Sequence, residues 1–358
     1  MAFYDNIQLV INRLLLETAR RNASDLHISV GRHPTLRIDG ELILMKEEAV
    51  LTPADTEKIC LGLLNEKQKE RLAQEKSVDF SYEFKEKARF RANVFYQRGF
   101  LSAAFRLIPC KIRTITDLGL PPVLEKLTDL AQGLVLFVGP SGHGKSTSLA
   151  ALLDLINHKR PDHIITIEDP IEYLFTQDKC IIDQRELYQD TNTFPDALRS
   201  ALREDPDVVM VGEMRDLDTI TTAVTVAETG HLVFSTVHTN NASQTIDRVI
   251  DVFPSHQQNQ VRFQLANVLV GIISQRLLPR VGGGLIVACE IMMVNSAVRN
   301  LIREQKTYQI ESILQTGAEE GMVPLDKSLS RLVREGLIEM NHALMYAQDP
   351  KNFRSLLK

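Results

Sequence analysis

Residues 139–146 read GPSGHGKS and combine glycines, a lysine and a hydroxyl in a pattern that could bind phosphate. They match G-x-x-x-x-G-K-[ST]. Glycines let successive backbone N–H groups turn toward a phosphate, Lys145 would neutralise the β- and γ-phosphates, and Ser146 would hold Mg²⁺. A chance match in a glycine turn is the alternative. The apolar run LVLFV before the loop and the helical segment TSLAALLDLI after it favour nucleotide binding through Gly139, Pro140, Ser141, Gly142, His143, Gly144, Lys145, Ser146 and Thr147.

Carboxylates end two further apolar runs of the sequence. IITIED delivers Glu168 and Asp169, and VVMVGE delivers Glu213. Carboxylates at the carboxyl ends of parallel strands face the crevice where ligands bind, so one could position an attacking water while another supports Mg²⁺ through water. Single strand-end carboxylates are more often solvated or cap the next helix, but two of them beside a phosphate loop favour catalysis. Where P-loop enzymes usually place Asp, this chain has Gly212 followed by Glu213.

Histidines and arginines are candidates for contacts with the phosphates. The run LVFSTVH ends at His238, and His231 precedes it. An imidazole at a strand end could sense the γ-phosphate, although a lone histidine here is more often structural. Phosphoryl transfer also gains from a guanidinium, which a neighbouring subunit often supplies. The candidates are Arg91, Arg98 and Arg106 in the first part of the chain, and Arg203, Arg215 and Arg276 in the second.

The elements before residue 115 predict a small α+β domain. Residues 6–20 have apolar side chains at helical spacing, and residues 25–42 alternate as a hairpin that turns at Asp39-Gly40. Three later segments have the pattern of short, half-buried strands of an antiparallel sheet: residues 78–84, 89–99 and 101–109. We therefore assign residues 1–114 to this domain and residues 115–122 to a linker.

The elements after the linker predict a parallel sheet covered by helices. Apolar runs alternate with helical segments from Gly133 onward, which is typical of strands that are buried on both faces. Residues 261–278 place apolar side chains on one face of a helix, and residues 285–294 are a last strand. We assign residues 123–295 to this core and residues 296–358 to a mostly helical carboxy-terminal region.

Composition excludes several classes of protein. The chain has 358 residues, 44% of them hydrophobic, and a formal net charge of -5, which argues against a nucleic-acid-binding protein. The start MAFYDNIQLV does not have the pattern of a secretion signal, and no stretch of about 18 consecutive apolar residues occurs. The four cysteines are far apart and form no CxxC pair, so neither a zinc site nor a disulfide framework is indicated. We expect a cytoplasmic protein.

Five blocks of the sequence resemble the type II/IV secretion ATPases. In order they are GPSGHGKS, IITIEDPIEYLF, DPDVVMVGEMRD, TGHLVFSTVHTNNA and AVRNLIRE, and the resemblance covers nearly the whole chain. It implies a PAS-like amino-terminal domain joined to a RecA-like P-loop ATPase domain. By this likeness Glu168 is the catalytic base, Glu213 lies at the Mg²⁺ site, and His231 and His238 form a histidine box.

The same resemblance implies a function, most similar to that of the family branch that retracts type IV pili. It implies a homo-hexameric motor that binds ATP and Mg²⁺ and drives twitching motility. The motor would lie at the inner face of the cell membrane, bound there only through an inner-membrane platform protein, with no nucleic-acid partner. The alternatives are a non-motor accessory ring subunit, a pilus-assembly or secretion ATPase, and a nucleic-acid translocase.

Three details of the sequence bear on these alternatives. Assembly and secretion ATPases usually carry a tetracysteine zinc insert after the acidic block, where this chain has only Cys180. His143 stands where the family more often has a small residue, and Ser141 where it often has Thr. In the block AVRNLIRE we expect a helix that packs its apolar side on the core and directs Arg299 and Arg303 outward.

Overall fold

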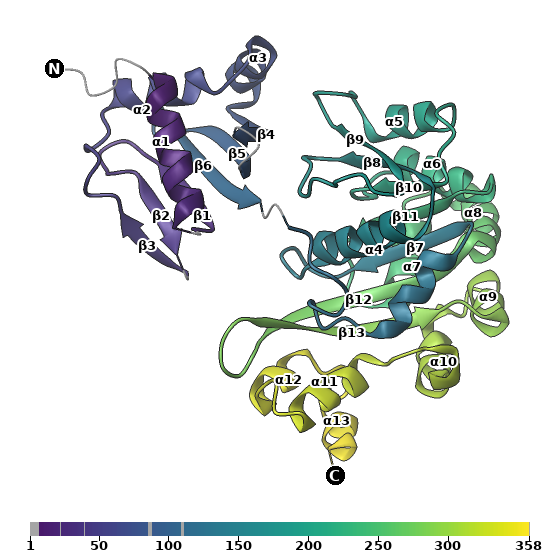
Figure 1. Cartoon of the computed structure of the whole chain (residues 1–358). Coiled ribbons are helices and arrows are strands. Elements are labelled where there is room, and N and C mark those ends of the chain that lie inside the picture. The colour runs from purple at the N-terminus through teal and green to yellow at the C-terminus, as the bar shows by residue number, and fades with distance from the viewer. Residues whose placement is uncertain (1–6, 22, 39, 85–87, 109–110, 358) are drawn as a thin grey trace. The chain divides into compact units, whose positions relative to one another are not determined.

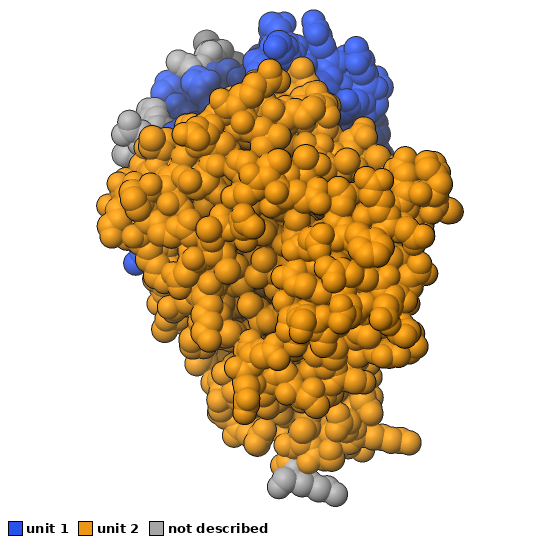
Figure 2. All heavy atoms as spheres, turned by 90° about the vertical axis from the view of Figure 1, so that its right-hand side faces the viewer, with its two compact units in different colours: residues 1–111, 170–174 blue, residues 112–169, 175–358 orange. Residues whose placement is uncertain are grey.

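The computed structural model describes residues 7–21, 23–38, 40–84, 88–108 and 111–357, and Figure 1 shows its helices and strands. The chain divides into two compact units, which Figure 2 distinguishes by colour. The first unit comprises residues 1–111 together with 170–174, and the second comprises residues 112–169 and 175–358. The chain therefore passes from the first unit to the second between Lys111 and Ile112, and the short segment 170–174 belongs to the first unit again. Each unit is described by itself.

The first unit is an antiparallel sheet with helices, as predicted. Its strands follow the order β3-β2-β1-β6-β5-β4, and every neighbouring pair is antiparallel. The helix predicted at the start is present and buries its apolar side in the core of this unit. Asp39 of the predicted turn lies outside the described residues. The elements are α1 (Ile7–Arg20), β1 (Asp25–Ile28), β2 (Thr35–Ile38), β3 (Glu41–Leu44), α2 (Pro53–Gly62), α3 (Glu66–Glu75), β4 (Ser77–Phe84), β5 (Ala88–Gln97) and β6 (Phe100–Ile108).

The second unit is built on a mostly parallel sheet of order β13-β12-β7-β11-β10-β8-β9. β12 and β13 pair antiparallel, and the other neighbouring strands pair parallel. The strands are β7 (Gly133–Val138), β8 (His163–Glu168), β9 (Ile181–Glu186), β10 (Val208–Val211), β11 (Leu232–Val237), β12 (Leu269–Pro279) and β13 (Leu285–Met293). The helices before β13 are η1 (Pro122–Asp129), α4 (Lys145–Lys159), α5 (Phe194–Ala201), α6 (Leu217–Glu228), α7 (Ala242–Asp251) and α8 (Ser255–Val268).

Both faces of this sheet are buried, which confirms the prediction from the apolar runs. Along β7, Leu134 and Leu136 belong to one core cluster, whereas Val135 and Phe137 belong to another. Helices α5 to α8 contribute to the first cluster, and η1 and α4 contribute to the second. Because successive side chains of a strand point to opposite faces, the alternation shows that helices cover both sides.

The helix predicted over residues 261–278 is correct only in its first half. α8 ends at Val268, and Leu269 begins β12, which pairs with β7 on one side and with β13 on the other. The run LVGIIS is continuously apolar and β-branched at Ile272 and Ile273, a composition that suits a central strand as well as a buried helix. Pairing with two strands supplies backbone hydrogen bonds on both edges and decides in favour of the strand.

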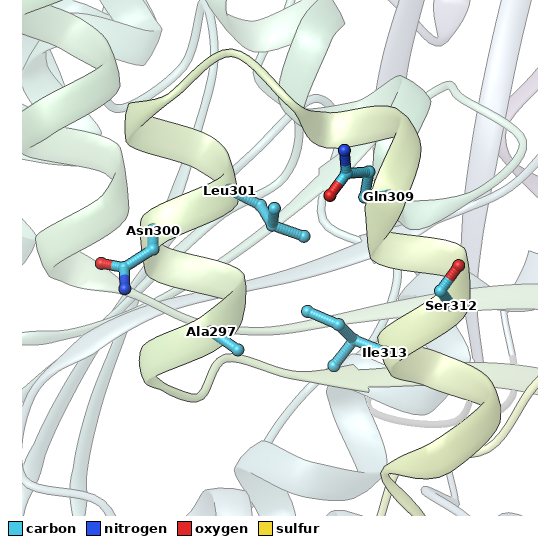
Figure 3. Close-up of a pocket in the computed structure, with 6 residues that line it drawn as sticks. All are labelled: Ala297, Asn300, Leu301, Gln309, Ser312 and Ile313. Carbon is cyan, nitrogen blue, oxygen red and sulfur yellow. The ribbon is translucent and has the colours of Figure 1, made fainter.

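The carboxy-terminal region is helical, as predicted. Its elements are α9 (Ser296–Arg303), η2 (Thr307–Gln309), α10 (Ile310–Thr316), η3 (Ala318–Glu320), α11 (Leu325–Arg334), α12 (Met340–Tyr346) and α13 (Pro350–Leu356). Leu301 of α9 and Ile313 of α10 point into a pocket that is also lined by Ala297, Asn300, Gln309 and Ser312 (Figure 3). Helices α11 to α13 pack around Leu278 and Ala288 of β12 and β13. None of the helices in the described part of the chain has the length and hydropathy needed to cross a membrane.

The expected outward orientation of Arg299 and Arg303 is wrong. The guanidinium of Arg299 donates through Nη1 to the carbonyls of Ala266 and Asn267, at 2.5 and 2.8 Å, and Arg303 Nη2 donates to Asn267 Oδ1 at 2.7 Å. These acceptors lie in the last turn of α8, whose terminal carbonyls have no partner within the helix. The two arginines therefore bind the carboxyl end of α8, where a positive charge is favourable.

Candidate nucleotide site

Four neighbouring strands of the second unit end at the same edge of the sheet. In the order β7-β11-β10-β8 their last residues are followed by the phosphate loop, His238, Gly212-Glu213 and Asp169. The register is continuous, with Val138 beside Val237, and Val211 beside both Ser235 and Ile167. The structure thus brings Lys145, His238, Glu213 and Glu168 to one edge. At about 4.8 Å per strand, β8 lies about 14 Å across the sheet from β7.

The phosphate loop has the backbone that its glycines permit. Gly139, Gly142 and Gly144 have φ values of 145°, 78° and 82°, all in the region that favours glycine. At Gly139 a Cβ atom would lie 2.6 Å from the carbonyl oxygen of Gln275, so only glycine fits between the loop and β12. Helix α4 begins directly after the loop at Lys145. A helix amino terminus that follows such a loop presents N–H groups and a positive dipole to an anion.

Lys145 is buried and bound to its own loop. Its ammonium donates to the carbonyls of Gly139 at 2.9 Å and Pro140 at 3.0 Å, and it lies 3.5 Å from Nδ1 of His238. A phosphate must compete with these two carbonyls for the ammonium. Because a charged acceptor binds an ammonium more strongly than a neutral carbonyl does, a triphosphate would draw Lys145 toward itself.

His238 connects Lys145 to Glu213. Its Nε2 lies 3.5 Å from Oε2 of Glu213, and Arg215 Nε lies 2.6 Å from the same oxygen. Burial and the charge of Lys145 lower the pKa of His238, and the Glu213 carboxylate opposes them. A neutral imidazole therefore stands between a cation and an anion. Addition of phosphate charge near Lys145 would favour protonation of His238, which is the behaviour expected of a sensor.

Glu168 is buried and its carboxylate is oriented by two neighbours. Thr166 Oγ1 donates to Oε1 of Glu168 at 2.8 Å, and Gln184 Nε2 donates to the same oxygen at 3.2 Å. Gln184 is itself oriented, because its Oε1 accepts the N–H of Phe175 at 3.0 Å. Sequence reasoning missed Thr166 and Gln184. The signal for Gln184 would have been a strand over residues 181–186, which pairs with β8 and places Gln184 beside Thr166.

Of the other predicted residues in the second unit, Arg276 lies at this edge, where its guanidinium donates to the carbonyls of Gln275 and Asn240, both at 2.8 Å. His231 and Arg203 lie away from it. His231 precedes β11 and contacts the carbonyl of Val226 through Nδ1 at 2.9 Å, at the opposite end of that strand from His238. Arg203 is exposed after α5. Arg91 and Arg106 are paired across β5 and β6 in the first unit, where Arg106 also binds Asp25 at 3.0 Å. Contacts of these residues with a neighbouring subunit stay predictions.

The residues at this edge fit Mg²⁺ that is bound mainly by phosphate and water. Within the described ranges, no three His, Cys, Asp or Glu side chains gather in a way that could hold a metal ion. Ser146 lies in the first turn of α4, and Glu213 follows β10, so one hydroxyl and one carboxylate are present. Mg²⁺ in nucleotide sites typically uses few protein ligands and keeps several waters.

The fold and the site together define a P-loop nucleotide-binding protein. The model of the family described as "Type II/IV secretion system protein" matches residues 4–355, and the chain belongs to this family. It is 47% identical to "Type IV pilus retractation ATPase PilT" of Pseudomonas aeruginosa over 346 residues, which are 96% of this chain and 99% of the relative. It is 45% identical to "Twitching motility protein" of Neisseria gonorrhoeae, over 89% of this chain and 85% of the relative.

A solved structure also resembles this chain over nearly its whole length. The crystal structure of the pilus retraction motor PilT with bound ADP superposes with a TM-score of 0.89 at 48% identity, and covers 96% of this chain and 99% of that one. The predicted family and fold class are confirmed by these comparisons.

Proposed function

We propose that this chain is an ATPase that powers the retraction of type IV pili. Its likeness to the retraction ATPase and to the crystallised retraction motor extends over almost the full length of all three chains. The observation that carries the proposal is the site itself. An intact phosphate loop shares one sheet edge with a buried carboxylate, Glu168, that two side chains orient.

Nucleotide binding would begin at the phosphate loop. The N–H groups of the loop and of the first turn of α4 would bind the phosphates. Lys145 would exchange the carbonyls of Gly139 and Pro140 for the β- and γ-phosphates. When bound, Mg²⁺ neutralises phosphate charge, and Ser146 would hold it directly while Glu213 would hold it through water.

Hydrolysis would then depend on Glu168. Its carboxylate would accept a proton from a water molecule while the oxygen of that water bonds to the γ-phosphorus. The bond between the γ-phosphorus and the bridging oxygen breaks at the same time, and the electron pair leaves with ADP. Thr166 and Gln184 donate to Oε1 of Glu168 and would hold the carboxylate in place while it accepts this proton. His238 would sense the charge of the γ-phosphate and transmit this signal to Glu213.

The motor would work as a ring of six copies. The chain itself places one arginine, Arg215, against Glu213, while Arg91, Arg106 and Arg203 lie elsewhere in the two units. A guanidinium from a neighbouring copy would complete the charge stabilisation of the transferred phosphoryl group. The ring would act on an inner-membrane platform protein from the cytoplasmic side, and would touch the membrane only through that partner.

An accessory subunit that binds nucleotide without hydrolysing it is the alternative. The presence of Lys145, Glu168 and Glu213 at one edge of the sheet favours the motor, because a subunit that only binds nucleotide has no need of an oriented base.

Phosphate release from Mg-ATP tests the proposal. Glu168→Gln should still bind ATP but reduce turnover at least about a hundredfold, because proton transfer by a positioned base contributes about that much or more. Lys145→Ala should weaken ATP binding itself.

Turnover per chain of the wild type should rise with protein concentration as rings form. Wild-type protein that binds ATP without releasing phosphate would instead support the accessory subunit.

A further inference from the structure

The side chain of His143 reaches from the phosphate loop to two other parts of the second unit. Its Nδ1 accepts the backbone N–H of Leu277 in β12 at 3.1 Å. Its ring also lies edge-to-face against the ring of Tyr346, the last residue of α12, with centroids 6.1 Å apart and planes at 73°. This geometry is favourable for aromatic pairs. The residue that departs from the family pattern therefore makes contacts outside the loop.

His143 is suited to accept this hydrogen bond. Burial lowers the pKa of the imidazole, and the nearby charges of Arg276 and Lys145 lower it further. A neutral imidazole has one acceptor nitrogen, and the N–H of Leu277 identifies it as Nδ1. The opposite nitrogen then carries the proton.

β12 supports the loop at further points. The carbonyl oxygen of Gln275 lies against Gly139, and Gln275 Nε2 donates to Ser148 Oγ in α4 at 2.8 Å. His143 thus adds a third tie between β12 and the segment that runs from the loop into α4. Of these ties, only the one through His143 also involves a residue of the carboxy-terminal helices.

A second connection runs from the same carboxy-terminal segment to the other side of the site. Gln348, two residues after Tyr346, donates through Nε2 to Oε2 of the buried Glu290 at 2.8 Å. Oε1 of Glu290 accepts the N–H of Ala242 at 2.9 Å, at the start of α7 shortly after His238. Asp326 of α11 holds the segment by accepting the N–H groups of Gln348 and Asp349. Residues 346–349 are therefore tied to both loops that flank the nucleotide site.

We propose that His143 is a positioning residue that couples the phosphate loop to helices α11–α13, so that nucleotide binding and the order of these helices favour each other. This inference rests on the proposed nucleotide site. An anchored loop loses less conformational freedom when it binds phosphate, so the anchor raises affinity. Because coupling between two sites is reciprocal, bound nucleotide must in turn stabilise the helices that hold the anchor.

ADP affinity of the full-length protein tests the first half of this proposal. Loss of one hydrogen bond and one ring contact in His143→Ala should weaken ADP binding about three- to tenfold. His143→Asn can place its Oδ1 near the position of Nδ1 but has no ring to contact Tyr346, so its affinity should lie between those of wild type and His143→Ala. His158→Ala, at an exposed histidine of α4, is the matched control and should bind as wild type.

Hydrogen exchange and a double-mutant cycle test the coupling. ADP should slow exchange in residues 340–356 of the wild type, and this protection should be lost in His143→Ala. Tyr346→Leu should weaken ADP binding by itself, and the combination with His143→Ala should weaken it less than the product of the two single effects. Tyr308→Leu, at a tyrosine that is 71% exposed, is the control.

The outcomes separate this inference from the proposed function. If His143→Ala binds ADP as tightly as wild type, or if ADP leaves exchange in 340–356 unchanged in wild type, the coupling is wrong while the nucleotide site stands. If His143→Asn is as weak as His143→Ala, the hydrogen bond to Leu277 does not position the loop. If the wild type itself binds no ADP, the nucleotide site and the inference fall together.

Discussion

Glu168 and Lys145 are held in different ways, and this difference determines how each responds to substitution. Lys145 contacts backbone carbonyls of its own loop, which no side-chain substitution elsewhere removes. Glu168 is oriented by side chains, Thr166 and Gln184. The orientation of the proposed base is therefore open to test without changing either the base or the loop.

Gln184→Leu should reduce the kcat of ATP hydrolysis roughly fivefold to tenfold with little change in KM. The substitution removes a donor to Glu168 and leaves the phosphate loop intact, so the transition state is affected more than binding. Gln184→Glu should move the acid limb of the pH–rate profile to higher pH, because a second carboxylate raises the pKa of Glu168. Steady-state kinetics across pH measures both effects.

Gln177→Leu is the matched control for Gln184. The amide of Gln177 donates to the backbone carbonyl of Ile182 at 3.2 Å, and not to Glu168. Ile182 lies in β9, the strand that contains Gln184. A loss of kcat in Gln177→Leu as large as that in Gln184→Leu would contradict a specific role for Gln184.

The residues of the site differ in how far sequence could predict them. Four residues of the site each follow or end an apolar run of the sequence: Lys145, Glu168, Glu213 and His238. Parallel strands bring such positions to one edge of the sheet. Their convergence was therefore predictable. Gln184 was not, because its role depends on which strand lies beside β8, and a short polar strand such as IIDQRE has no periodicity that identifies its neighbour.

At the scale of elements, α8 shows how tertiary contacts override a local pattern. Apolar side chains continue at helical spacing beyond Val268, yet the helix ends there and β12 begins. Arg299 of α9 supports this helix end by binding the carbonyls of Ala266 and Asn267. Neither the position of the helix end nor the capping arginine could be inferred from the periodicity, since both depend on the packing of α9 against α8.

Arg299→Ala should lower the free energy of unfolding by about 1–2 kcal/mol. The substitution removes two hydrogen bonds and a positive charge from the carboxyl end of α8. Chemical denaturation of the purified protein measures the loss. The neighbouring Asn300 is exposed in the same helix, and Asn300→Ala should change stability by less than about 0.5 kcal/mol. Equal losses in the two variants would show that Arg299 does not act as a cap.

At the scale of the whole chain, the order of elements was predictable because each class of element has its own period. Alternating short strands indicated the antiparallel sheet of the first unit, and apolar runs between helices indicated the parallel sheet of the second. Residues 170–174 were not predictable in the same way. They follow β8 in the sequence but belong to the first unit, and no local pattern marks a five-residue segment that leaves one unit for another.

The central claim is that ATP hydrolysis at this site retracts pili, and complementation in cells tests it most directly. Cells of the source organism that lack the gene should carry excess surface pili and fail to twitch. The wild-type gene should restore twitching and normal piliation, whereas Glu168→Gln, expressed at the same level, should restore neither. Twitching at the wild-type rate in cells that carry only Glu168→Gln would contradict the claim.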